Sequence, residues 1–143
     1  MVTRAQFVAE ARTWLGTPFQ HQARVRGAGV DCVGLVIGVA RDLGLADVQI
    51  ADYPRTPQAS RLMTECRQHM RPLALASVQP GDVLLMRFRR EPQHVAVAAD
   101  YVHGGLSIVH AYEGAGAVVE HRLDDAWLAR VVASFSIPGI VDE

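Results

Sequence analysis

Apolar residues recur at helical spacing near the start of the chain. Thr3 and Gln6 stand three positions apart, as in a capping box, and predict a helix that ends at Gly16 and Pro18. Residues 17–30 contain several glycine, proline and polar positions and are expected to form a loop. The apolar positions of the first helix that should face the core are Phe7, Val8, Ala11, Trp14 and Leu15.

The same pattern predicts two further helices. Asp31 is a suitable N-cap and Gly44 a suitable C′ residue for a helix over residues 32–43. This helix is apolar nearly all round, so we expect it to be buried. Thr56 as a cap and Pro57 at the first helical position predict a third, more amphipathic helix. The apolar stripe of the third helix consists of Leu62, Met63, Cys66 and Met70.

After a turn at residues 79–82, the apolar positions change to a strand-like pattern. Residues 124–129 are expected to add one helical turn before the last strand. Helices first and strands afterwards predict an α+β fold, with N-terminal helices packed on a mainly antiparallel five-stranded sheet. The length suits one domain over residues 1–143. The expected strands, rich in β-branched residues, are 83–88, 94–99, 106–112, 117–123 and 130–137.

Composition and charge exclude several classes of function. The chain has 14 Lys and Arg against 15 Asp and Glu, so neither nucleic acid nor an anionic membrane is the expected partner. No apolar run is long enough to span a bilayer and no signal peptide is recognisable, so we expect cytoplasmic synthesis without membrane insertion. The two cysteines form no CxxC pair, and no disulfide between them is expected.

Cys32 is the first candidate for chemistry, because it opens the second predicted helix. The unpaired N–H groups and the dipole of a helix N-terminus stabilise a thiolate and lower the pKa of a thiol. The carboxylate of Asp31 opposes this effect, and a cysteine nucleophile also needs an imidazole partner. The alternative interpretation of Cys32 is a small core residue at the start of a helix.

Two histidines fall within predicted strands. If residues 101–105 form a hairpin loop, residue 94 pairs opposite residue 112, and His94, His110 and Tyr112 share one face of the sheet. His94 is then a candidate general base, and His110 would fix its tautomer. Both histidines have the alternative interpretation of satisfied core or surface residues. The other histidines are expected on the surface or in loops, with the first of them in the loop that leads to Cys32: His21, His69, His103 and His121.

These features occur together in one ordered set of motifs. Residues 14–35, "WLGTPFQHQARVRGAGVDCVGL", are followed by "QPGDVLLMRF", "HVAV" and "IVHAY". This order resembles the NlpC-type family of papain-like cell-wall cysteine peptidases, with its G-x-P-aromatic segment, G-x-D-C-x-G-L motif, PGD strand and two histidine strands. The resemblance implies a papain-like fold and a triad of Cys32 as nucleophile, His94 as base and His110 as third member.

The resemblance also implies a substrate. Members of the family mostly cleave amide bonds in peptidoglycan stem peptides, and Asp31 would hold the amine of the substrate. The backbone N–H groups at the start of the Cys32 helix would stabilise the oxyanion. Val33 stands where the family usually has serine, and Phe19 where it commonly has tyrosine. We therefore expect the substrate-binding side of the cleft to be more apolar than is usual for the family. His21 is expected to line the cleft.

The lack of a signal or cell-wall-binding module is similar to the phage-tail-associated subgroup of the family. The expected partners are therefore peptidoglycan stem peptides and other phage-tail proteins, with the chain incorporated into a phage-like tail. No cofactor and no metal is expected. Three alternatives stay open: a non-catalytic structural tail-tip component that retains the fold, a zinc-binding module built from cysteine and histidine, and related thiol chemistry on other substrates, such as acyl transfer to lipids.

Overall fold

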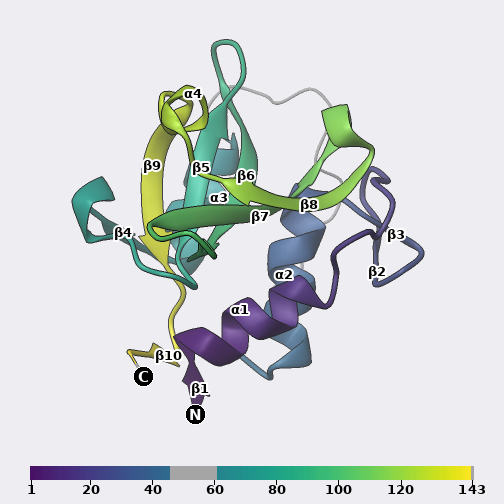
Figure 1. The fold of residues 1–143 in the computed structure, drawn as a ribbon, viewed down its shortest axis with the longest axis horizontal. Helices are drawn as coiled ribbons and strands as arrows, with labels where there is room; N and C mark the ends of the chain where they lie inside the picture. Colours follow the sequence, from purple (N-terminus) through teal and green to yellow (C-terminus); the bar gives the residue numbers. More distant parts are fainter. Residues whose placement is uncertain (46–60, 143) are drawn as a thin grey trace.

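Six strands form the main sheet, and the longer helices pack with one of its faces (Figure 1). The computed structural model describes residues 1–45 and 61–142. The helices are α1 (Arg4–Arg12), α2 (Cys32–Asp42) and α3 (Arg61–His69). All neighbouring strands of the sheet are antiparallel, which confirms the α+β class. Their order is β4 (Arg71–Leu73), β9 (Val131–Ser136), β5 (Val83–Arg87), β6 (Pro92–Asp100), β7 (Leu106–Tyr112) and β8 (Ala117–Arg122).

Short elements complete the fold. β1 (Val2–Thr3) pairs in parallel with β10 (Ile140–Val141), which brings the two ends of the chain together (Figure 1). Within residues 1–45 and 61–142, no helix is both long and apolar enough to cross a membrane. The remaining elements are β2 (Arg24–Val25) and β3 (Gly29–Val30), helix α4 (Asp125–Leu128), and the 3₁₀ turns η1 (Leu75–Ser77) and η2 (Glu113–Ala115).

The predicted helices form, with small differences at their ends. The Thr3 and Gln6 side chains make the capping box of α1. Helix α1 ends at Arg12, so Leu15 lies beyond its buried stripe and is 43% exposed, where we expected it in the core. The expected start of the third helix at residues 56–57 lies outside the described residues. Its apolar stripe is confirmed: Cys66 is buried, and Leu62, Met63 and Met70 pack against the core.

The expected number of strands was wrong by one, because β4 was not predicted. β4 has only three residues, Pro72 stands at its centre, and none of its side chains is fully buried. It pairs with β9 alone, at the edge of the sheet, where proline is tolerated. A short edge strand of this kind carries no apolar alternation for the sequence to reveal. The predicted loop over residues 17–30 likewise contains the small hairpin of β2 and β3.

The sheet separates two clusters of buried residues, and this division positions the candidate site. The larger cluster lies between the helices and one face of the sheet. Gly38 of α2 is required there, because a Cβ atom would lie 2.7 Å from the ring of Trp14, which follows α1. The smaller cluster includes Leu84, Met86, Ala96 and Ile108, with Trp127 of α4 packed against it.

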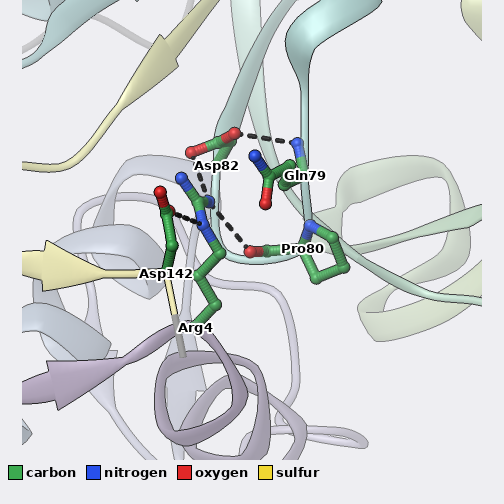
Figure 2. Close-up of polar contacts among 5 residues, drawn as sticks. All are labelled: Arg4, Gln79, Pro80, Asp82 and Asp142. Atoms are coloured by element: carbon green, nitrogen blue, oxygen red, sulfur yellow. Dashed lines mark hydrogen bonds and ion pairs between the residues drawn. The ribbon is translucent and has the colours of Figure 1, made fainter.

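Arg4 joins α1 to the turn before β5 and to the C-terminal segment (Figure 2). Its Nη1 atom donates to the Asp82 carboxylate at 2.8 Å and to the carbonyl oxygen of Pro80 at 3.1 Å. The Asp82 side chain is 1% exposed and also accepts from the backbone N–H of Gln79. The aspartate of the "PGD" motif therefore holds the turn and a helix together.

We expect Arg4→Met to lower the free energy of unfolding by about 2–3 kcal/mol, because it removes a charged donor from the buried Asp82 carboxylate. Asp142→Asn is the matched control. It breaks the second ion pair of Arg4, whose Asp142 partner is 74% exposed, and should cost less than about 1 kcal/mol. Urea unfolding of both variants measures the difference, and equal losses would contradict the structural role of Asp82.

Candidate active site

Cys32 is the first residue of α2, and the segments around it hold its position tightly. The Asp31 side chain caps the helix, with Oδ1 accepting from the Gly34 N–H at 2.8 Å and Oδ2 accepting from the Gln22 N–H at 2.7 Å. Gly34 is required, because a Cβ atom would lie 2.5 Å from the carbonyl oxygen of Ala23. The aspartate and glycine beside Cys32 therefore fix the preceding loop against the helix.

The thiol of Cys32 is protonated at neutral pH. Burial, with a smaller contribution from the Asp31 carboxylate, raises its pKa to about 12. Hydrogen bonds from the backbone N–H groups of Val95, Val33 and Cys32 itself act in the opposite direction but do not compensate. The N–H groups at the helix N-terminus lower the pKa, as expected, but desolvation of the thiolate outweighs them, so the net shift is upward.

Strands β6 and β7 pair in the expected register and bring two histidines together. Val97 pairs with Val109, and the same register places His94 opposite Tyr112. The Nε2 atom of His94 lies 2.6 Å from Nδ1 of His110, and both residues are buried. The prediction that His94, His110 and Tyr112 share one face of the sheet is therefore confirmed.

Aromatic rings enclose this histidine pair. The Phe88 ring lies 5.2 Å from His94, Tyr112 stacks on His110 at 5.4 Å, and Trp127 meets His110 edge-on at 5.0 Å. Burial lowers the pKa of His94 to about 3 and that of His110 to about 2. Both imidazoles are therefore neutral at neutral pH, so each has one N–H donor and one acceptor nitrogen.

Cys32 and His94 lie on neighbouring elements, since α2 packs against β6. The backbone N–H of Val95, the residue after His94, is close enough to the Cys32 sulphur to lower the pKa of the thiol in part. Among the described residues, no side-chain hydrogen bond yet joins the Cys32 sulphur to the His94 ring. Catalytic hydrogen bonds are often long in ligand-free structures and shorten when substrate binds. The arrangement thus places a thiol and an imidazole on adjoining elements without an ion pair between them.

The predicted substrate-binding residues lie around the Cys32 helix in different environments. Asp31 is 2% exposed, and His21 is half-buried with its Nδ1 atom 3.8 Å from the Asp31 Oδ2 atom. The Phe19 ring is half-buried and packs against the larger core cluster. Val33 is 7% exposed and lines an apolar pocket between α2, α3 and the sheet, so its side chain presents little surface to a ligand.

His121, which we expected on the surface or in a loop, belongs to the histidine cluster. Its Nε2 atom lies 2.9 Å from Nε2 of His110, and its Nδ1 atom lies 3.0 Å from the carbonyl oxygen of Arg122. His121 pairs with Ile108 across β7 and β8, so it shares a face with His110. The sequence could have revealed this position. If the strands predicted at residues 106–112 and 117–123 pair across the turn at residues 113–116, the alternation of side chains places His121 on the same face as His110.

The raised pKa of Cys32 predicts how alkylation by iodoacetamide depends on pH. Since only the thiolate reacts, the rate at Cys32 should rise about tenfold for each pH unit from about pH 7 to about pH 9. Cys66, which is 4% exposed and whose pKa burial also raises to about 12, should react far more slowly in the folded protein. Peptide mass spectrometry separates the two sites, and a plateau near neutral pH would reveal a resting thiolate instead.

The sequence of the chain matches one known protein family. The model of the NlpC/P60 family matches residues 16–135. The NlpC/p60 domain of the peptidoglycan hydrolase SagA has a similar structure, with 23% identity, a TM-score of 0.67 and coverage of 95% of this chain and 100% of that chain. No curated protein shows significant similarity to the chain.

Two further structures are similar at lower identity. An NlpC/P60 family protein from Bacillus cereus has 15% identity and a TM-score of 0.68, over 92% of this chain and 39% of that chain. An N-acetylmuramoyl-L-alanine amidase from Bacteroides uniformis has 12% identity and a TM-score of 0.63, over 94% of this chain and 98% of that chain. At these identities the likeness establishes a shared fold.

Proposed function

Because this chain belongs to the NlpC/P60 family, we propose that it is a cysteine peptidase or amidase that cleaves amide bonds in peptidoglycan stem peptides. The fold of the family supports the proposal, since papain-like helices pack on a mainly antiparallel sheet here too. One observation carries it: the buried His94–His110 pair, with a 2.6 Å contact, lies on strands that pack against α2, the helix that begins at Cys32.

The proposed reaction begins with a neutral thiol and a neutral imidazole. The Cys32 sulphur attacks the carbonyl carbon of the amide while His94 takes the thiol proton, because neither thiolate nor imidazolium is stable in the resting site. Backbone N–H groups at the start of α2 stabilise the negative oxygen of the tetrahedral intermediate. The C–N bond then breaks, the amine leaves with the proton from His94, and the acyl group stays on sulphur.

Hydrolysis of this thioester completes the cycle. His94 takes a proton from water, the resulting hydroxide attacks the thioester carbonyl, and the Cys32 sulphur leaves and recovers its proton. His110 receives the Nε2–H of His94 throughout and stabilises the imidazolium as it forms. Burial of both rings among aromatic residues strengthens this hydrogen bond, since water does not compete for it.

We also propose that Asp31 binds the amine of the stem peptide, with His21 beside it. Asp31 Oδ1 accepts from the Gly34 N–H and Oδ2 from the Gln22 N–H, and these bonds fix the carboxylate beside Cys32. Val33 and Phe19 lack the hydroxyl groups usual in the family, so neither side chain can bind a free amine, and we propose tolerance for longer, cross-linked stem peptides. Incorporation of the chain into a phage-like tail stays a prediction from the sequence, testable by mass spectrometry of purified particles.

Digestion of purified peptidoglycan tests the proposed function. We expect soluble fragments with new free amino groups, and mass spectrometry of the fragments identifies the bond that was cleaved. Pre-treatment with iodoacetamide at alkaline pH should abolish the release, since it blocks the nucleophile. Intact peptidoglycan after prolonged incubation with the untreated protein would instead support the non-catalytic structural alternative.

A further inference from the structure

Three histidine rings form a continuous row that ends at a backbone carbonyl. His94 Nε2 contacts His110 Nδ1 at 2.6 Å, and His110 Nε2 contacts His121 Nε2 at 2.9 Å. The Nδ1 atom of His121 lies 3.0 Å from the carbonyl oxygen of Arg122. The row runs from the buried face of β6 across β7 to the partly exposed His121 on β8.

The carbonyl at the end of this row determines where each proton lies. A carbonyl oxygen only accepts, so Nδ1 of His121 carries a proton, and in an imidazole with a single proton Nε2 is then an acceptor. His110 must then donate from Nε2 and accept at Nδ1, and His94 must donate from Nε2. The Nδ1 atom of His94 then carries a lone pair. In the proposed reaction this is the ring nitrogen that takes the Cys32 proton.

The contact between His94 and His110 does not by itself determine which nitrogen of the His94 ring carries the proton. With His110 alone, the opposite arrangement is equally satisfied: His110 donates from Nδ1, His94 accepts at Nε2, and the His94 proton sits on Nδ1. In that arrangement His94 has no lone pair for the thiol. The acceptor nitrogen of His121 favours the arrangement in which His94 carries its proton on Nε2 and can accept the thiol proton at Nδ1.

We infer that His121 is a positioning residue, which sets the tautomer of His110 and through it the tautomer of the base His94. The inference rests on the proposed function, because it concerns the base of the same reaction. The ring of Trp127 packs on both partners, 5.0 Å from His110 and 5.0 Å from His121, and keeps the row aligned. The ring nitrogens point at one another, and the described residues contain no group of three or more potential metal ligands arranged to bind an ion.

Two substitutions of opposite character separate this role from a structural one. His121→Phe keeps an aromatic ring against Trp127 but removes the acceptor, whereas His121→Glu removes the ring and supplies a group that only accepts. A packing role predicts that the phenylalanine variant performs better, and the positioning role predicts the reverse. His103→Gln, in the exposed loop after β6, is the matched control for loss of a histidine.

Nitrogen-15 NMR of the histidine rings and steady-state kinetics on peptidoglycan fragments provide the readouts. We expect protonated Nε2 and unprotonated Nδ1 at His94 in the unaltered protein and in His121→Glu, and a mixture of tautomers in His121→Phe. The kcat of His121→Phe should fall about 10-fold or more with KM unchanged, since His121 does not touch substrate. His121→Glu should retain most of the kcat, and His103→Gln all of it.

A proton on Nδ1 of His94 in the unaltered protein would overturn the inference, and so would unchanged tautomers and turnover in His121→Phe. If His121→Phe does not fold, the spectrum of the unaltered protein and that of His121→Glu still decide the question. The expected tautomers in a protein that never cleaves peptidoglycan would refute the proposed function while supporting the role of His121 in ordering the row.

Discussion

Cys32→Ala should release no soluble fragment from purified peptidoglycan under conditions in which the unaltered protein digests it fully. The substitution removes the sulphur that carries the acyl group, so we expect the rate to fall about 10⁴-fold or more. The second cysteine, Cys66, is buried in the core on α3 and cannot replace it. Fragment release is measured by chromatography and mass spectrometry at equal protein concentrations.

Cys66→Ala is the matched control for this experiment. It removes the other thiol of the chain and should keep the activity, although the lost sulphur leaves a small cavity in the core. Circular dichroism of both variants shows whether each remains folded. Equal fragment release by Cys32→Ala and the unaltered protein would exclude Cys32 as the nucleophile.

His94→Ala should lower kcat by about 10²–10⁴-fold, the usual contribution of a general base. The effect should be near the upper end, because the pKa of the Cys32 thiol is about 12 and few thiolates form without a base. Since burial lowers the pKa of His94 to about 3, the ring stays unprotonated, and thus competent as a base, from neutral pH far into the acid range. Measuring kcat of both proteins at several pH values tests the size of the loss and the pH range in which His94 acts as a base.

The double variant Cys32→Ala/His94→Ala tests whether the two groups act as a unit. Once the nucleophile is absent, the base has no proton to take, so the double variant should be no less active than Cys32→Ala alone. Losses that add on a logarithmic scale would show that His94 contributes by a route independent of Cys32.

Local patterns in the sequence determined much of the fold. The capping box of Thr3 and Gln6 and the cap at Asp31 placed the starts of α1 and α2, because these contacts join residues only three positions apart. The alternation of strand residues and the hairpin at residues 101–105 placed His94, His110 and Tyr112 on one face. The same alternation, applied to the hairpin of β7 and β8, also places His121 on this face.

Other properties depend on groups that are distant in the sequence, and only the tertiary structure decided them. The pKa of Cys32 rises because the packed core removes water from the thiol, an effect that no local pattern reveals. The ion pair of Arg4 with Asp82 joins residues 78 positions apart, and β4 exists only because β9 offers it an edge. The sequence by itself indicated Cys32, His94 and His110 as candidates for the chemistry and placed both histidines on one face of the sheet. The folded chain decided how strongly each thiol and imidazole holds its proton, since that depends on burial and on the hydrogen-bond partners that folding brings together.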